Sequence, residues 1–212
     1  MAKLQDIIQW CDQTLKSPEF KDYAPNGLQI EGKTEVHKIL AAVTASQDAI
    51  DAAIRENADL LLVHHGYFWK GEAYPITGMR GKRIKSLIQH DISLLAYHLP
   101  LDSHPSLGNN AAIADLLKLE RIEALDPSER HPIGNIGYLN QPMPVEDFKK
   151  FVSETLKFDV THLPADKTMI EKVGFCTGGA QDFIVKAAEQ GCDAYISGEV
   201  SERTFYEAKE LG

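Results

Sequence analysis

The segment KILAAVTASQDAIDAAIRENADLLLVHHG, residues Lys38–Gly66, decides the fold class that the sequence predicts. An apolar run is followed by an amphipathic stretch that begins at Ser46, and then by a second apolar run. This is the pattern of a strand, a helix and a parallel strand. Because similar alternations fill the rest of the chain, the sequence predicts an α/β fold with mainly parallel or mixed sheets.

The same pattern returns later in the chain. The segment KVGFCTGGAQDFIVKAAEQGCDAYISGE, residues Lys172–Glu199, aligns with the first segment without a gap at a constant offset of 134 residues. The alignment pairs Asp59 with Asp193 and places Glu199 at the position of His65. We interpret this as an internal duplication that gives two related lobes; the alternative is chance similarity between two strand-helix-strand units.

A Pro- and Gly-containing stretch at residues 126–135 predicts a loop between the lobes, so the first lobe is expected at residues 1–125 and the second at 126–212. The predicted helices span residues 3–16, 46–56, 82–90, 110–117, 145–156, 181–189 and 202–210. The predicted strands span residues 28–31, 39–43, 60–64, 93–98, 136–139, 173–176 and 194–197.

Composition excludes several classes of protein. A net charge of -9 without a Lys/Arg cluster disfavours nucleic-acid binding. The cysteines Cys11, Cys176 and Cys192 have no C-x-x-C spacing, so we expect reduced, partly buried thiols rather than a disulfide framework or a zinc knuckle. No apolar stretch approaches the length of a membrane span, and the N-terminal segment is an amphipathic helix, so we place the protein in the cytoplasm.

Two adjacent histidines follow an apolar strand. His64 and His65 come directly after the second apolar run, and Gly66 allows the backbone to leave extended geometry. Asp102 follows the next apolar strand, with Pro100 expected to interrupt that strand and return the aspartate to a loop. Carboxyl ends of parallel strands share one sheet edge, where two imidazoles and a carboxylate form a common ligand set for zinc, manganese or iron. Hydrogen-bonded loop histidines are the alternative.

Other residues near these strand ends are weaker candidates. His98 and His104 could orient the metal ligands through hydrogen bonds, or be ordinary loop residues. Glu199 could act as a general base, reach the metal from the other lobe or cap a helix. Gly178 and Gly179, between a strand and a helix, could expose amides to an anion or simply form a tight turn.

Three aromatic residues, Tyr67, Phe68 and Trp69, follow the histidine pair. They could stack on a base or pterin-like ring, but packing or a subunit contact is the more common use of such a run.

The stretches DYAPNGLQIEG, LLVHHGYFWKGE, YHLPLDSHPSLGNN, CTGGAQ and DAYISGEVSE together make the chain resemble the bacterial GTP cyclohydrolase type 2 homologue family, also called the NIF-three-like family. The resemblance implies a two-lobed α/β subunit, a toroidal homohexamer and a dinuclear metal centre facing its interior. It assigns ligation to His64, His65 and Asp102, with the carboxylate bridging. The implied cofactors are divalent metal ions, two per subunit, of zinc, manganese or iron.

The family pattern continues past the helix that matches SERTFYEAKELG into another strand and a G-H-x-x-T-E motif. The histidine and glutamate of that motif complete the metal shells in the family. The present sequence stops at Gly212, so we expect the second lobe to lack its C-terminal strand and the remaining ligands to lie in a tail.

The leading functional hypothesis is a metal-dependent hydrolase, in which two divalent metals activate water against a nucleotide or related small substrate. The family name suggests the guanine ring of GTP as the target, and no catalytic residue is assigned beyond the metal ligands. The alternative is a non-catalytic metal-binding ring protein with a regulatory or scaffolding role. A metal coordination position open to water would indicate the hydrolase, because a structural site fills its coordination with protein atoms.

Overall fold

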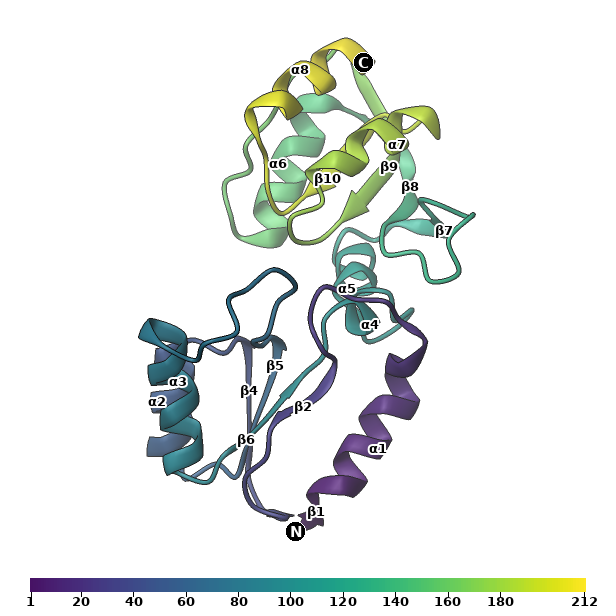
Figure 1. Cartoon of the computed structure of the whole chain (residues 1–212). Helices are drawn as coiled ribbons and strands as arrows, with labels where there is room; N and C mark the ends of the chain where they lie inside the picture. The colour runs from purple at the N-terminus through teal and green to yellow at the C-terminus, as the bar shows by residue number, and fades with distance from the viewer. The chain divides into compact units, whose positions relative to one another are not determined.

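The computed structural model describes residues 1–212 and divides the chain into two compact units, Met1–Leu101 and Asp102–Gly212 (Figure 1). Each unit contains its own four-stranded mixed sheet with helices packed against it. This confirms the predicted α/β class with mixed sheets.

The sheet of the first unit has the strand order β2-β6-β5-β4. Strands β4, β5 and β6 are parallel, whereas β2 is antiparallel to β6, and β1 and β3 form a separate antiparallel pair. The strands are β1 (Ala2–Lys3), β2 (Gly27–Ile30), β3 (Glu35–Val36), β4 (Ile39–Thr44), β5 (Leu60–His65) and β6 (Ser93–Ala96).

Helices cover both faces of this sheet. Helix α1 (Leu4–Leu15) packs on one face, while α2 (Gln47–Arg55) and α3 (Gly78–Gln89) pack on the other (Figure 1). Along β5, Leu61 belongs to the apolar cluster with α2 and α3, and its neighbour Leu60 belongs to the cluster with α1. A strand covered on both sides carries apolar residues at every position, which explains its unbroken apolar run.

The second unit contains a sheet of strand order β10-β9-β8-β7, in which only β9 and β10 are parallel. One face packs against α6 through Phe148 and Val152, and the other packs against α7 through Ala187. The elements are α5 (Asn109–Leu116), β7 (Glu120–Ala124), β8 (Asn135–Pro144), α6 (Val145–Leu156), β9 (Met169–Cys176), η2 (Gln181–Phe183), α7 (Ile184–Glu189), β10 (Ala194–Ser197) and α8 (Glu202–Leu211).

The repeated sequence segments adopt the same strand-helix-strand geometry, β4-α2-β5 in the first unit and β9-α7-β10 in the second. Ala42 lies opposite Val63 in the first parallel pair, and Cys176 lies opposite Ser197 in the second. Every residue pair in the register of β9 and β10 has its counterpart in β4 and β5 at the sequence offset of the alignment. The similarity therefore extends to the hydrogen-bond register.

A buried aspartate directly precedes the second strand of the first segment. The carboxylate of Asp59 accepts hydrogen bonds from the backbone amides of His37 and Lys38 at 2.9 and 3.2 Å, and from Lys33 Nζ at 2.7 Å. The hydrogen bond from Lys33 and those from the two amides lower the pKa of Asp59 to about 2, against the opposing effect of burial. Through these hydrogen bonds the carboxylate links the residue before β5 to the segment before β4.

The second segment repeats this arrangement residue by residue. Asp193 accepts hydrogen bonds from the amides of Glu171 and Lys172 at 3.1 and 3.0 Å, and from Lys167 Nζ at 3.0 Å. Partial burial by itself raises the pKa of Asp193, but these hydrogen bonds bring it below the ordinary value. The side chain of Asp193 is more exposed than that of Asp59, at 22% against 8%.

The boundary between the units lies at Leu101 and Asp102, earlier than the predicted division at 125/126. Helix α5 and strand β7 belong to the second unit, because Ala114 packs into the same core as Phe148 and β7 pairs with β8. The Pro- and Gly-rich loop at residues 126–134 thus lies inside the second unit, between β7 and β8. An amphipathic helix does not indicate by its own sequence which sheet it will cover.

Several short elements differ from the sequence prediction, among them the strands β1, β3 and β7 and the helix α4. The strand β7 was not predicted because its sequence, ERIEA, is highly charged; it is an exposed edge strand, where charges are tolerated. Pro100 does not send Asp102 into a loop, since Leu99–Asp102 forms the short helix α4. Proline is compatible with the first turn of a helix, where its missing amide would have no partner.

The three cysteines are free, with Cys11 and Cys176 buried and Cys192 half-buried, as predicted. Burial raises the pKa of Cys176 to about 12 and that of Cys192 to about 11, so both thiols stay protonated at neutral pH. None of the helices combines the length and apolar character needed to cross a membrane.

Candidate metal centre

Three imidazoles of the first unit converge at one end of its sheet. The potential ligand atoms of His64, His65 and His98 all lie within 4.8 Å of one another. The ring centroids of His64 and His65 are 4.4 Å apart, and that of His98 lies 5.1 Å from His64 and 5.7 Å from His65. All three side chains are half-buried, so the cluster combines partial shielding with access from solvent.

The end of β5 explains how adjacent residues share one cluster. Pairing between β5 and β6 stops at Val63 and Ala96, whereas pairing with β4 continues to Thr44 and His65. Successive side chains point to opposite faces within a regular strand, but His64 and His65 occupy its last two positions. Their rings are tilted at 46°, and Nδ1 of His65 lies 3.2 Å from the Thr44 hydroxyl.

Glycine is required at position 66 because two other segments of the same chain approach its backbone closely. A Cβ atom at this position would lie 2.7 Å from the Cβ of Ala96 and 2.2 Å from Oε1 of Gln29. The same Gln29 oxygen accepts a hydrogen bond from the amide of Tyr67 at 2.7 Å. The residue after the histidine pair therefore has no room for a side chain, which adds a steric reason to the predicted conformational one.

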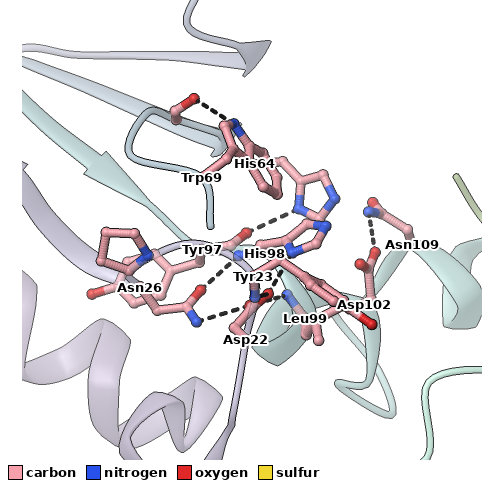
Figure 2. A network of polar contacts seen from close by, with 12 residues as sticks. Asp22, Tyr23, Asn26, His64, Trp69, Tyr97, His98, Leu99, Asp102 and Asn109 are labelled. Atoms are coloured by element: carbon pink, nitrogen blue, oxygen red, sulfur yellow. Dashed lines mark hydrogen bonds and ion pairs between the residues drawn. The ribbon is translucent and has the colours of Figure 1, made fainter. Parts of the chain in front are cut away.

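Hydrogen bonds define the tautomers of two of the rings. Nδ1 of His64 lies 2.9 Å from the carbonyl oxygen of Tyr97, and Nδ1 of His98 lies 2.7 Å from Oδ1 of Asp22 (Figure 2). A carbonyl or an ionised carboxylate only accepts, so Nδ1 must donate in both cases. In the neutral rings the lone pair then resides on Nε2, which is the arrangement commonly found in metal-binding histidines.

Asp22 is the centre of a buried hydrogen-bond network. Its side chain is only 2% exposed, and it accepts hydrogen bonds from the amides of Tyr23 and Leu99 at 2.6 and 2.9 Å. It also accepts from Nδ2 of Asn26 at 2.9 Å and from His98. Burial by itself raises the pKa of Asp22, but these bonds, led by that from His98, bring it below the ordinary value. The carboxylate is therefore ionised at neutral pH.

The pairing of β2 with β6 brings Asp22 to His98. Because Gly27 pairs with Ala96 in an antiparallel register, the residues before Gly27 run beside those after Ala96. Local sequence patterns do not single out Asp22, although the residue opens the DYAPNGLQIEG stretch that carries part of the family resemblance. A lone aspartate before a turn gives no local signal of this contact.

Trp69 borders the imidazole cluster. Its ring meets that of His98 edge to face, at 5.0 Å and 82°, and lies 5.9 Å from that of His65. The indole Nε1 donates to the carbonyl of Gly66 at 3.2 Å, which holds the ring in place (Figure 2). The aromatic ring thus forms an apolar side of the candidate centre.

The other two aromatic residues of this run have different environments. Tyr67 is buried in the core of the first unit, and its hydroxyl donates to the carbonyl of Ala45 at 2.7 Å. This is a packing role, in line with the more common use of such residues. Phe68 is 37% exposed and has a left-handed backbone conformation, with φ of 65°.

Asp102 is the first residue of the second unit, whereas the three imidazoles belong to the first. It is buried, and its Oδ1 accepts a hydrogen bond from Nδ2 of Asn109 at 2.8 Å. The three-residue group contains His98, which the sequence suggested as an orienting residue. Ligation by Asp102 remains a prediction.

His104 takes part in a local turn. Its Nδ1 accepts hydrogen bonds from the amides of Ser106 and Leu107 at 3.3 and 3.0 Å. With Nδ1 as the acceptor, the neutral ring carries its proton on Nε2, opposite to the tautomer of His64 and His98. This arrangement supports the interpretation of His104 as a loop residue.

The glycine pair of the second unit forms a tight turn next to an acidic side chain. Gly178 has a φ of 76°, and its carbonyl accepts a hydrogen bond from the amide of Gly198 at 3.1 Å. A Cβ atom at Gly179 would lie 3.3 Å from Oε2 of Glu199, whose side chain is exposed. An anion bound at this turn would meet the negative charge of Glu199, so the turn geometry favours the structural interpretation.

The imidazole cluster suits a transition-metal ion. Imidazole nitrogen is a good ligand for zinc, iron, copper and nickel. Nitrogens bound tetrahedrally to zinc at about 2.1 Å lie about 3.4 Å apart. Ligand atoms that already lie within 4.8 Å of one another need only small side-chain movements to reach that spacing.

Fold and site together define a class of protein: two mixed α/β units, with a cluster of imidazoles at the strand ends of the first. The family model for Duf34/NIF3 (NGG1p interacting factor 3) matches residues 2–212. The chain belongs to this family.

Relatives with high identity carry the name GTP cyclohydrolase 1 type 2 homolog. The protein from Haemophilus influenzae is 51% identical over 209 residues, which cover 98% of this chain and 82% of that protein. The one from Escherichia coli K12 is 44% identical over 211 residues, covering 99% of this chain and 83% of the relative.

Solved structures have the same fold. The structure described as protein ybgI, of unknown function, superposes with a TM-score of 0.94 at 43% identity, covering 100% of this chain and 84% of that one. Reduced HcgD from Methanocaldococcus jannaschii gives a TM-score of 0.81 at 25% identity, with the same coverage.

Proposed function

We propose that the chain is the subunit of a divalent-metal-dependent hydrolase that acts on a nucleotide or a related small substrate. The observation that carries this proposal is the convergence of three imidazoles, two of which donate a hydrogen bond through Nδ1. The name shared by the relatives, GTP cyclohydrolase 1 type 2 homolog, supports a nucleotide as the substrate class.

In this proposal His64 and His65 would hold a divalent cation through ring nitrogens, with His98 beside them, and Asp102 would be the further ligand that the family resemblance implies. A bound divalent cation would polarise a substrate oxygen and lower the pKa of a water molecule, giving a nucleophile at neutral pH. Trp69 shields one side of the cluster and would restrict the approach of substrate and water to the remaining sides.

We also propose that the subunits assemble into a toroidal homohexamer, as the resemblance to the family implies. Light scattering coupled to size-exclusion chromatography measures the molar mass of the assembly directly. A monomeric mass at micromolar concentration would contradict this part of the proposal.

The test is turnover by metal-loaded protein. The protein is loaded with Zn²⁺, Mn²⁺ or Fe²⁺ and incubated with GTP and a panel of other nucleotides, and products are separated by chromatography. His64→Ala is expected to abolish metal-dependent turnover, because it removes a ligand. His90→Ala is the matched control, since His90 is an exposed histidine of the same unit that is not part of the cluster.

Two results would count against the proposal. Tight metal binding without turnover of any nucleotide would favour the non-catalytic metal-binding ring protein. Turnover that survives both a chelator and His64→Ala would show that the imidazoles are not the centre of the activity.

A further inference from the structure

We propose that Asn109 is a positioning residue of the candidate centre: its side-chain amide holds the carboxylate of Asp102 in one orientation and leaves the negative charge of that carboxylate available to a divalent cation. This inference rests on the proposed role of Asp102 as a metal ligand and deepens it. Asn109 itself touches neither cation nor substrate in this scheme.

The Asp102 carboxylate needs such a contact because its own geometry does not fix it. Asp102 is the last residue of α4 and is only 6% exposed. Rotation of a carboxyl group about its last side-chain bond has no sharp preference, unlike rotation between tetrahedral carbons. A carboxylate that must meet a cation in a defined geometry is therefore held by neighbouring groups. Nδ2 of Asn109 supplies this contact, since it donates to Oδ1 of Asp102 at 2.8 Å (Figure 2).

The chain between the two residues folds back on itself to make this hydrogen bond. Asn109 is the first residue of α5, seven positions after Asp102. In the intervening turn the ring of His104 accepts hydrogen bonds from two backbone amides, and its carbonyl oxygen accepts one from the amide of Gly108 at 3.1 Å. The turn around His104 thus returns the chain to Asp102.

The next residue, Asn110, holds the backbone of Asp102. Asn110 is 1% exposed, and its Nδ2 donates to the carbonyl oxygen of Asp102 at 3.3 Å and to that of Ile133 at 2.5 Å. Its Oδ1 accepts from the amide of Thr177, directly after β9, at 2.9 Å. The two adjacent asparagines therefore have different roles: Asn110 joins the backbone at Asp102 to other segments of the second unit, and Asn109 orients the side chain.

The chemistry of the donor matters as much as its position. A side-chain amide donates a hydrogen bond without carrying a charge, whereas a lysine or arginine would offset the charge of the carboxylate and compete with a cation. Each carboxylate oxygen has two lone pairs, so Oδ1 can accept from Asn109 and still bind a metal ion. An asparagine at this position therefore orients the Asp102 carboxylate and preserves its charge.

The test is a double-mutant cycle on metal affinity, with Zn²⁺ alone as the probe and isothermal titration calorimetry as the measurement. Asn109→Leu replaces the amide by an apolar group of similar size and is expected to weaken binding by about 10- to 100-fold. In the Asp102→Ala background the same substitution is expected to change the affinity less than about twofold, because the carboxylate that Asn109 orients is gone. An equal loss in both backgrounds, or no loss in either, would overturn the inference.

Asn135→Leu is the matched control for a merely structural effect. Asn135 is also half-buried and also lies in the second unit, but its Nδ2 donates to the carbonyl oxygen of Glu123 at 3.3 Å. The control is expected to leave the zinc affinity unchanged. A loss as large as that in Asn109→Leu would mean that both substitutions disturb the second unit as a whole, and would overturn the inference.

A crystallographic measurement needs no variant. In crystals of the unchanged protein loaded with Zn²⁺, the hydrogen bond between Asn109 and Asp102 is expected to persist while the carboxylate binds the ion. A carboxylate that leaves Asn109 to reach the ion, or an ion bound without Asp102, would overturn the inference even if Asn109→Leu failed to fold.

These readouts separate the inference from the proposed function. Zinc binding with the expected cycle, but without turnover of any nucleotide, would reject the hydrolase and keep the positioning role. Turnover that depends on His64, together with unchanged zinc affinity in Asn109→Leu, would keep the hydrolase and reject the role of Asn109. Absence of zinc binding by the unchanged protein would reject both.

Discussion

The two strand-helix-strand segments have the same framework and end in different chemistry. In both, an aspartate directly before the second strand accepts hydrogen bonds from a lysine and two backbone amides, at positions related by the sequence offset. At the other end of these strands, His64 and His65 in the first segment correspond to Gly198 and Glu199 in the second. The comparison teaches that the residues that build the framework and those that build the site can change separately.

The strand order of the first unit brings a third histidine to the end of β5. Strand β5 lies between β4 and β6, so residues that follow β6, including His98, can join those at its end. Strand β10 pairs with β9, and its residues are half-buried.

Removing a proposed metal ligand from the first segment should have the largest effect. We expect His65→Ala to weaken Zn²⁺ binding by about 100-fold or more, because a ligand contributes more than a supporting residue. Glu199→Ala, at the equivalent position, should leave the affinity within about twofold, since Glu199 lies beside the Gly178 and Gly179 turn. Isothermal titration calorimetry of both variants measures the difference. A comparable loss in Glu199→Ala would show that the second segment takes part in the centre.

Replacing the two framework aspartates should affect stability unequally. Asp59→Ala should lower the free energy of unfolding by about 2–3 kcal/mol, because two backbone amides lose a charged, buried acceptor. Replacing the more exposed Asp193 by alanine should lower the free energy of unfolding by about 1 kcal/mol. Urea denaturation followed by circular dichroism checks both values. Glu56→Ala breaks an exposed ion pair with Lys38 and serves as the control, with little or no loss of stability. Equal losses at Asp59 and Asp193 would argue against burial as the reason for the difference.

The pH dependence of stability should show the smallest effect. The folded-state pKa of Asp59 is about 2, below the value of about 3.9 for an unfolded aspartate. Its stabilising contribution is therefore complete above about pH 5 and is lost as the pH falls toward 2. Urea titrations between pH 6 and pH 3 should show a shallower decline for Asp59→Asn than for the unchanged protein. Parallel declines would mean that this carboxyl titrates normally in the folded state.

Most of the framework could be predicted from local sequence patterns. The helix expected at residues 145–156 and the strand at 194–197 have the predicted bounds, because apolar periodicity and turn residues are local properties. Strand β7 and the unit boundary could not be predicted in this way. A charged edge strand resembles a loop, and the sheet that α5 covers depends on contacts with residues far along the chain.

The sequence by itself determined the α/β class, the repeat and the placement of His64 and His65 at a strand end. These follow from the order of apolar and polar residues over short stretches. Only the tertiary structure decided that His98 joins the pair and that Asp22 accepts a hydrogen bond from it. The physical reason is the antiparallel pairing of Gly27 with Ala96, which brings the residues before β2 beside those after β6. Nothing in either stretch alone specifies that pairing.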